Sequence, residues 1–299
     1  MKRFQHIVVN LTLQDADAAV LSWTANLVRL AGAKKISVLH AWQPVDIPIE
    51  LKERYPWLLE PGEDVALKRM NELLEHHLQV EDGVEIERVV YRGSPLGEVL
   101  RVAESGSADL VVCGRSVADL FLSEKLARKA PCSVLTVPPL AGTEFDRVMV
   151  PVDYSQYSRQ ALDIGLAFAQ AEDAKLTVFH AFEVPWGQSR SMMSRGDFVR
   201  DLHEFHQRQL REFVADVGAR GVQVDYQVRE SLLAPTAIAS AVEEGGHDLV
   251  IIGCRGHHAI YATLLGSTAE SILHGCPVPV VAVKLKGSRS SFLAALRGA

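Results

Sequence analysis

The sequence repeats itself at a spacing close to half its length. Residues 104–114 (ESGSADLVVCG) and residues 243–253 (EEGGHDLVIIG) are identical at six of eleven positions when the chain is shifted by 139 residues. A shift of 141 residues aligns FQHIVV, residues 4–9, with FDRVMV, residues 145–150. The register drifts by only two residues between these matches, so the chain is a tandem duplication and has to fold as two copies of one unit.

Composition agrees with two similar domains. The chain has 299 residues, 48% of them apolar, which is enough to bury two cores. We place the domains at residues 1–140 and 141–299, joined by a linker at Pro138–Gly142. The net charge of −6 divides evenly: 16 Lys and Arg against 19 Asp and Glu up to Leu140, then 15 against 18. Neither half carries a basic surface that favours nucleic acid or an anionic membrane.

The chain ends and cysteines predict a cytoplasmic protein. The first residues, MKRFQHIVVNL, have too short an apolar run for a signal peptide, and no stretch is long enough to cross a membrane. The four cysteines lack paired spacing, which indicates reduced thiols. We expect the tail, Gly287–Ala299, to be peripheral.

Strand and helix patterns alternate through each copy. In the second copy we expect strands at Val148–Val152, Leu176–Phe182, Gln223–Val228, Asp248–Ile252 and Val278–Val283. We expect helices at Ser158–Ala171, Phe198–Val217, Thr236–Glu243 and Thr268–His274, with Ser155 or Ser158 capping the first. This alternation predicts an α/β fold, with a mostly parallel sheet covered by helices on both faces.

Ligands of parallel sheets bind beyond the carboxyl ends of the strands. There the second copy has Gly253-Cys254-Arg255-Gly256, then nine residues, then Gly266-Ser267-Thr268 opening a helix. Glycines let backbone N–H groups approach phosphate oxygens, and a helix N-terminus favours negative charge. The pattern therefore indicates an anion cradle. Two other interpretations stay open: Ser267 and Glu270 form a capping box, and Gly253 and Gly256 are ordinary turn residues.

The spacing G-x2-G-x9-G-[ST] resembles the nucleotide-binding signature of the universal stress protein family, in its ATP-binding branch. Val150-Pro151-Val152-Asp153-Tyr154-Ser155 is similar to the first-strand segment of that family, and Phe179-His180-Ala181 to the end of its second strand. The resemblance covers nearly the whole chain, as in tandem two-domain members of the UspE type. It implies two Rossmann-like domains of the adenine nucleotide alpha hydrolase-like kind, each with a five-stranded sheet.

The resemblance also implies a binding site for ATP, with or without Mg²⁺, in the second copy. Its residues are Pro151, Val152, Asp153, Ala181, Ile252, Gly253, Arg255, Gly256, Gly266, Ser267 and Thr268. In this interpretation Asp153 accepts hydrogen bonds from the ribose, and backbone near Ala181 meets the adenine. The alternatives are that Asp153 caps the following helix and that Arg255 is solvated rather than bound to phosphate.

The first copy departs from the pattern. Thr12 stands at the position of Asp153, and Val117 at that of Gly256. Seven loop residues are missing before Pro131, and with them the Gly-Ser pair that opens the last helix. We therefore expect no ATP site of this type in the first copy.

The histidines carry little further signal. His203 and His206 have i, i+3 spacing, so we expect solvated helix residues rather than metal ligands. His257 and His258 lie inside the nine-residue loop, where a role near phosphate or a metal stays open. His40 and His180 occupy the same place in both copies, which favours a role in the fold.

Three functions remain in view. The first is a stress-response regulatory or signalling module that binds ATP through residues 141–299. The second is a slow ATPase or phosphotransferase, although no motif supplies a general base. The third is a scaffold for dimerisation or for a non-nucleotide ligand, with lids at Ala41–Gly62 and Pro185–Asp197. By resemblance, strands Ser133–Val137 and Val278–Val283 pair in an intramolecular pseudo-dimer, and a further homodimer stays open.

Overall fold

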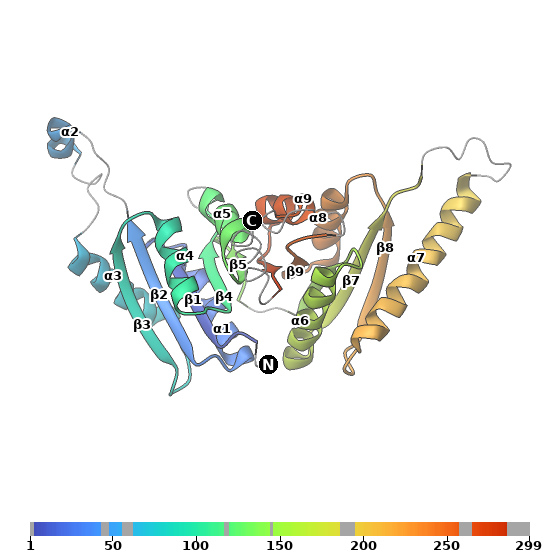
Figure 1. The fold of residues 1–299 in the computed structure, drawn as a ribbon, viewed down its shortest axis with the longest axis horizontal. Helices are drawn as coiled ribbons and strands as arrows, with labels where there is room; N and C mark the ends of the chain where they lie inside the picture. The colour runs from blue at the N-terminus through green and yellow to red at the C-terminus, as the bar shows by residue number, and fades with distance from the viewer. Residues whose placement is uncertain are drawn as a thin grey trace, which may run out of the picture. The chain divides into compact units, whose positions relative to one another are not determined.

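The computed structural model describes residues 3–42, 48–55, 62–116, 120–143, 146–185, 195–256 and 265–285. The chain divides into two compact units, Met1–Thr143 and Glu144–Ala299. Figure 1 shows the same alternation of strands and helices in each unit. The expected tail, the His257-His258 pair and much of both expected lids lie outside the described residues.

The first unit has one five-stranded parallel sheet in the order β3-β2-β1-β4-β5. Its strands are β1 His6–Leu11, β2 Lys35–Trp42, β3 Glu85–Arg92, β4 Leu110–Gly114 and β5 Ser133–Val137. Its helices are α1 Asp17–Ala31, α2 Ile49–Arg54, α3 Glu63–His77, α4 Pro95–Ser105 and α5 Leu120–Lys129. The short helix α2 falls within a segment for which we expected only a loop.

The second unit repeats this topology in the order β8-β7-β6-β9-β10. Its strands are β6 Arg147–Pro151, β7 Lys175–Phe182, β8 Val224–Glu230, β9 Leu249–Gly253 and β10 Val280–Val283. Its helices are α6 Gln156–Glu172, α7 Arg195–Val217, α8 Ala234–Gly245 and α9 Ser267–Gly275. The expected α/β class is confirmed, because every strand pair within each unit is parallel and every crossover contains a helix.

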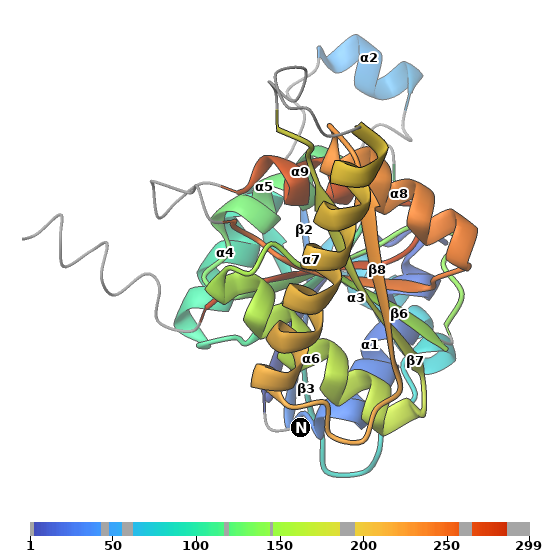
Figure 2. The same cartoon turned by 90° about the vertical axis from the view of Figure 1, so that its right-hand side faces the viewer.

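Helices cover both faces of each sheet. In the first unit α1 packs on α3, and α4 packs on α5; in the second α6 packs on α7, and α8 on α9. Figure 2 shows α6 and α7 together against β7 and β8. Chain order reverses between the first and fourth strands, so right-handed crossovers place the two helix pairs on opposite faces. That reversal is where parallel sheets bind ligands.

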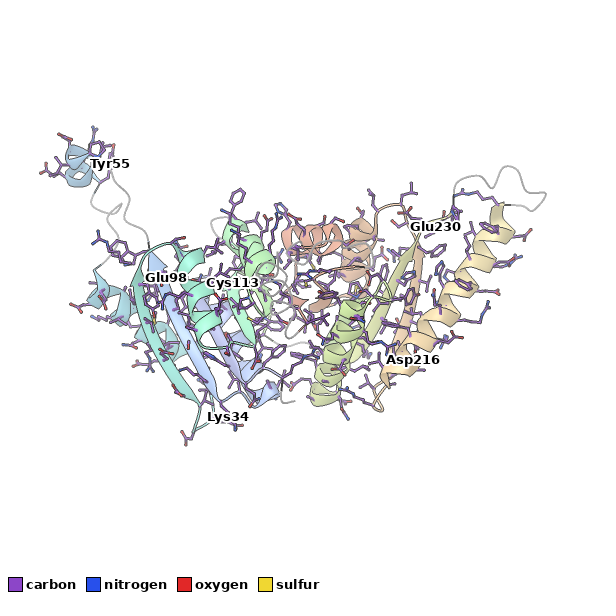
Figure 3. The ribbon with its side chains drawn as sticks, viewed as in Figure 1. Lys34, Tyr55, Glu98, Cys113, Asp216 and Glu230 are labelled. Carbon is purple, nitrogen blue, oxygen red and sulfur yellow. The ribbon has the colours of Figure 1, made fainter. Side chains whose placement is uncertain are left out.

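The sheets form the cores because their central strands are apolar on both faces. Ile7, Val8 and Val9 of β1 are fully buried, as are Val148 and Val150 of β6. Cys113 of β4, labelled in Figure 3, is likewise buried. All four cysteines are buried thiols rather than disulfides.

Candidate functional site

The first element of the site is the turn that follows β6. Asp153 leaves the strand, Tyr154 adopts a left-handed conformation with φ of 64°, and Ser155 begins the helix. The Ser155 side chain accepts a hydrogen bond from the Ser158 N–H at 3.2 Å, so Ser155 is the N-cap of α6. The alternative that Asp153 caps this helix is therefore wrong. Asp153 Oδ1 instead accepts the Ser155 N–H at 3.1 Å, which orients its carboxylate.

The second element is the glycine turn after β9. A Cβ atom on Gly253 would lie 2.8 Å from the backbone carbon of Tyr157 and 2.9 Å from the Ser158 nitrogen. Glycine is needed there because the strand end presses against the first turn of α6. A Cβ atom on Gly256 would lie 2.5 Å from Asp153 Oδ2, so this turn runs directly beside the Asp153 carboxylate.

The third element is the start of α9. The Gly266 N–H donates to the Cys254 carbonyl at 2.9 Å, which places the helix start against the glycine turn. Gly266 is the N-cap, and Ser267 is the first helical residue, with its side chain exposed. The capping box of Ser267 and Glu270 is therefore wrong, since Ser267 would have to be the N-cap. As in any helix, the first N–H groups have no acceptor within the helix.

Gly266 differs from Gly253 in what surrounds it. Its φ is −67°, and a Cβ atom would lie no closer than 3.6 Å to any atom outside its chain neighbours. Neither the backbone conformation nor packing against the described residues therefore requires glycine at this helix start.

Arg255 is held by a neighbouring helix. Its Nη1 donates to the Tyr157 hydroxyl at 2.8 Å, and its guanidinium lies 5.4 Å from the centre of the Tyr157 ring. Burial raises the pKa of the Tyr157 phenol, and Arg255 acts in the opposite direction. The guanidinium thus fastens the glycine turn to α6.

The remaining expected site residues lie at the same edge of the sheet. Pro151, Val152 and Ile252 are buried, so only their backbone groups can face a ligand. The Val152 N–H donates to the Phe179 carbonyl at 2.8 Å, which brings the end of β7, with half-buried Ala181, alongside the β6 turn. Thr268, in the first turn of α9, is also half-buried.

An aromatic cluster that no sequence motif marks lies beside this edge. The Tyr154 ring lies 4.6 Å from His180 and 5.4 Å from Phe213 between ring centres. His206 stacks on Phe182 at 4.8 Å and lies 5.0 Å from His180. Burial lowers the pKa values of His180 and His206 and raises that of the Tyr154 phenol.

The expectation that His203 and His206 are solvated is therefore wrong. Both are half-buried, and the His203 ring lies 6.4 Å from Phe182. Their partial burial was not predicted because α7 is largely polar and has few buried positions near its start. No sequence signal separates such a histidine from one that faces solvent.

The two equivalent histidines do share a role in the fold, as expected. His40 Nδ1 bonds to the Leu11 carbonyl in the first unit, and His180 Nδ1 bonds to the Val152 carbonyl in the second, both at 2.9 Å. A carbonyl can only accept, so each Nδ1 carries the proton. Each bond ties the end of the second strand to the end of the first.

At the matching edge of the first unit, a carboxylate of the protein holds the turn that follows β1. The Asp17 carboxylate accepts N–H bonds from Thr12 at 2.9 Å and Leu13 at 2.6 Å, and the Thr12 hydroxyl at 3.2 Å. Asp17 is only 2% exposed, and burial raises its pKa from 3.8 to about 6. Thr12, at the position of Asp153, is therefore committed to an internal contact. Val117 lies outside the described residues.

Within the described ranges, no group of three or more His, Cys, Asp or Glu residues could hold a metal ion. No helix in that part of the chain is long and apolar enough to cross a membrane.

The topology and the strand-end site define a duplicated Rossmann-like α/β protein. The model of the universal stress protein family matches residues 3–138 and 144–284, so the chain belongs to that family as a protein with two tandem domains. One curated relative, universal stress protein A homolog 2 of Coxiella burnetii, is 31% identical over 118 residues, which cover 39% of this chain and 78% of the relative.

Solved structures agree over the full length. A functionally unknown protein from Pseudomonas aeruginosa has a TM-score of 0.68 at 16% identity and covers 100% of this chain and 99% of its own. A universal stress protein from Archaeoglobus fulgidus has a TM-score of 0.60 at 20% identity and covers 93% and 96%. At these identities the likeness shows the fold alone.

Proposed function

We propose that the second unit binds ATP and that the protein acts as a nucleotide-binding regulatory module of the stress response. One observation carries the proposal: Asp153, Gly256 and Gly266 come from three separate segments and meet at one edge of the sheet. None of the described residues requires glycine at position 266, whereas a phosphate lying against the helix start would.

Each part of the nucleotide has a matching group. The first N–H groups of α9 and the turn at Gly256 suit the phosphates, because they offer backbone donors and the positive end of a helix dipole. The Asp153 carboxylate suits the ribose hydroxyls, and the backbone at Ala181 suits the adenine edge. We assign Arg255 to holding the turn, since its guanidinium is bonded to Tyr157.

A Mg²⁺ ion would be held by the phosphates rather than by a protein cage. Mg²⁺ sites of this kind use one or two carboxylates together with phosphate oxygens and water. Asp153 is the carboxylate that lies beside the turn, and we assign it to binding the ribose rather than Mg²⁺. The buried thiols support a reducing compartment, and we place the protein in the cytoplasm.

We further propose that the first unit binds no ATP. Its candidate ribose partner, the Thr12 hydroxyl, already donates to buried Asp17. The sequence there also lacks the Gly-Ser pair. In this proposal the two units share a fold, and only the second has a nucleotide site.

The test is mass spectrometry of the molecules released when the purified protein is denatured, together with calorimetry on adding Mg-ATP. We expect one adenine nucleotide per chain. Asp153→Ala and Gly266→Asp should abolish binding, because they remove the ribose acceptor and put a negative charge against the phosphates. The matched change in the first unit, Thr12→Ala, should leave binding unchanged.

Two nucleotides per chain would contradict the assignment of the first unit. No nucleotide, with no rise in melting temperature on adding Mg-ATP, would overturn the proposal as a whole. Recovery of ADP after incubation with ATP would favour the slow ATPase, and recovery of intact ATP would count against it.

A further inference from the structure

The first unit contains a cavity at the carboxyl ends of β1 and β2. Its volume is about 460 Å³, within the range of small-molecule sites. Thr12, Leu13 and His40 form the side nearest the strands, and α3 forms the opposite side with Val65 and Lys68. All of these residues belong to one unit, so the cavity does not depend on the second.

His40 supplies a polar group that none of the described residues satisfies. Its side chain is only 6% exposed, and it lines the cavity. Nδ1 donates to the Leu11 carbonyl at 2.9 Å, so Nε2 of the neutral ring carries a lone pair. This buried Nε2 has no hydrogen-bond partner among the described residues. An unpaired buried acceptor is costly, and a ligand hydroxyl would satisfy it.

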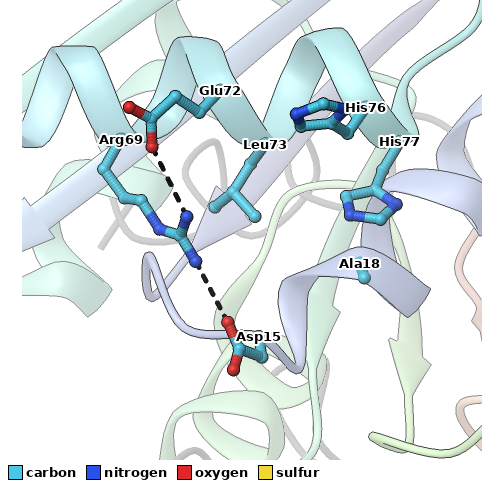
Figure 4. Close-up of a pocket in the computed structure, with 7 residues that line it drawn as sticks. All are labelled: Asp15, Ala18, Arg69, Glu72, Leu73, His76 and His77. Carbon is cyan, nitrogen blue, oxygen red and sulfur yellow. Dashed lines mark hydrogen bonds and ion pairs between the residues drawn. The ribbon is translucent and has the colours of Figure 1, made fainter.

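The α3 side supplies positive charge. Arg69 is already paired with Asp15 at 3.0 Å and Glu72 at 3.5 Å (Figure 4). The two carboxylates outweigh the single charge of Arg69, so this end of the cavity offers no net positive charge and the positive charge of α3 comes from Lys68. Lys68, on the neighbouring position of α3, makes no ion pair with any residue that the structure describes. Within that part of the chain no carboxylate competes for its ammonium group, and lysine binds phosphate or carboxylate as a compact charge.

The second unit shows how the same place can be filled. Tyr154 occupies the position of Leu13, with φ of 64° against 63°. Its ring packs on His180, which corresponds to His40, and on Phe213 of α7. Leucine in the first unit has no ring to place there, and the cavity lies beside it. The two units therefore differ here in the size of the side chain that follows the first strand and in what the neighbouring helix packs against it.

We propose that the first unit binds a small polyhydroxylated anion, a sugar phosphate or sugar acid, in this cavity, with a hydroxyl donating to His40 Nε2 and the anionic group on Lys68. The aliphatic walls at Leu13 and Val65 suit the carbon backbone of such a molecule. This site is separate from the nucleotide site of the second unit, and its occupation does not require ATP.

The test is isothermal titration calorimetry of the full chain with glucose 6-phosphate and with sodium gluconate. Glucose, which lacks the charge, and inorganic phosphate, which lacks the carbon chain and its hydroxyls, are the matched probes. We expect one of the two anions to bind with one site per chain, and glucose and phosphate to bind at least tenfold more weakly. The anion that binds more tightly shows whether the site prefers a phosphate or a carboxylate group.

Two variants locate the binding. Leu13→Tyr fills the cavity with the residue that the second unit uses in the same backbone conformation, and should abolish binding. Lys68→Gln removes an exposed charge without touching the core and should weaken binding about tenfold. Asp153→Ala, in the second unit, should leave it unchanged.

Three results would overturn the proposal: neither anion binds; glucose or phosphate binds as tightly as the anion; or binding survives in Lys68→Gln and is lost in Asp153→Ala. Circular dichroism establishes that each variant is folded. If Leu13→Tyr does not fold, Lys68→Gln and the probe series still decide the question.

Discussion

The buried carboxylate of Asp17 should make the first unit less stable at neutral pH than at acidic pH. Its pKa is 3.8 in a solvated chain and about 6 in the folded protein, because burial disfavours the charged form. The folded state therefore binds a proton more readily than the unfolded state between these values. The free energy of unfolding contributed by this group is highest below the unfolded pKa and falls as pH rises through about 6.

The magnitude follows from the two pKa values. Each pKa unit corresponds to about 1.4 kcal/mol, so ionised Asp17 costs the folded state about 3 kcal/mol above pH 6. At pH 4.5 the folded state holds Asp17 mostly protonated, and the difference between the two pKa values then costs the folded state only about 1 kcal/mol.

Asparagine can keep the geometry without the charge. Asp17 Oδ2 accepts the N–H groups of Thr12 and Leu13, and an amide oxygen can take its place. The amide nitrogen then replaces Oδ1 and can donate to the Thr12 hydroxyl, which is now an acceptor. Asp17→Asn should therefore stabilise the first unit by up to about 3 kcal/mol at pH 7.5, and by about 1 kcal/mol at pH 4.5.

Urea unfolding, followed by tryptophan fluorescence, measures this difference. Trp23 is fully buried in α1 and reports on the first unit. The control is Asp15→Asn, since the Asp15 side chain is fully exposed and its ion pair with Arg69 should contribute little. A variant at position 17 that is no more stable than the wild type at pH 7.5, or whose advantage does not shrink on acidification, would refute the reasoning.

Two further predictions concern the second unit. Gly253→Ala should lower stability by about 1–3 kcal/mol, because its Cβ meets backbone atoms of α6, while Gly266→Ala should not; thermal melting compares the pair, and equal melting temperatures would contradict the packing argument. The lowered pKa values of His180 and His206 mean that the folded state resists protonation, so stability should fall as pH drops below about 6.5. His206→Phe keeps the stack on Phe182 and should lose less melting temperature between pH 7.5 and pH 5.5; an equal loss would show that His206 is not the group responsible.

The sequence predicted most of the fold because the repeat and the apolar runs act at the level of whole elements. In the second unit the strand expected at Leu176–Phe182 is found at Lys175–Phe182, and the helix expected at Thr236–Glu243 at Ala234–Gly245. Buried parallel strands leave a continuous apolar signature that survives small errors at the ends. The short helix α2 was not predicted because its six residues are too few to show a helical period of apolar positions.

The site was predicted less completely because its details depend on close contacts. The glycine spacing located the strand-end turn, but it did not separate Gly253, which packing requires, from Gly266, where no described residue requires glycine. Nor did it show that Ser155 caps α6 in place of Asp153. The left-handed backbone of Tyr154 could not be predicted from the sequence, because that conformation is usually adopted by glycine or asparagine.

The left-handed residue after the first strand has a consequence for how a duplicated chain can diverge. Both units hold this residue in one backbone conformation, at Leu13 and at Tyr154. The backbone of the turn is therefore already settled, and only the size of one side chain has to change. A change in this one codon alters the space beside the strand ends in one half of the gene and leaves the other half as it was. Two ancestral copies could thus acquire different ligands without either passing through an unfolded intermediate sequence.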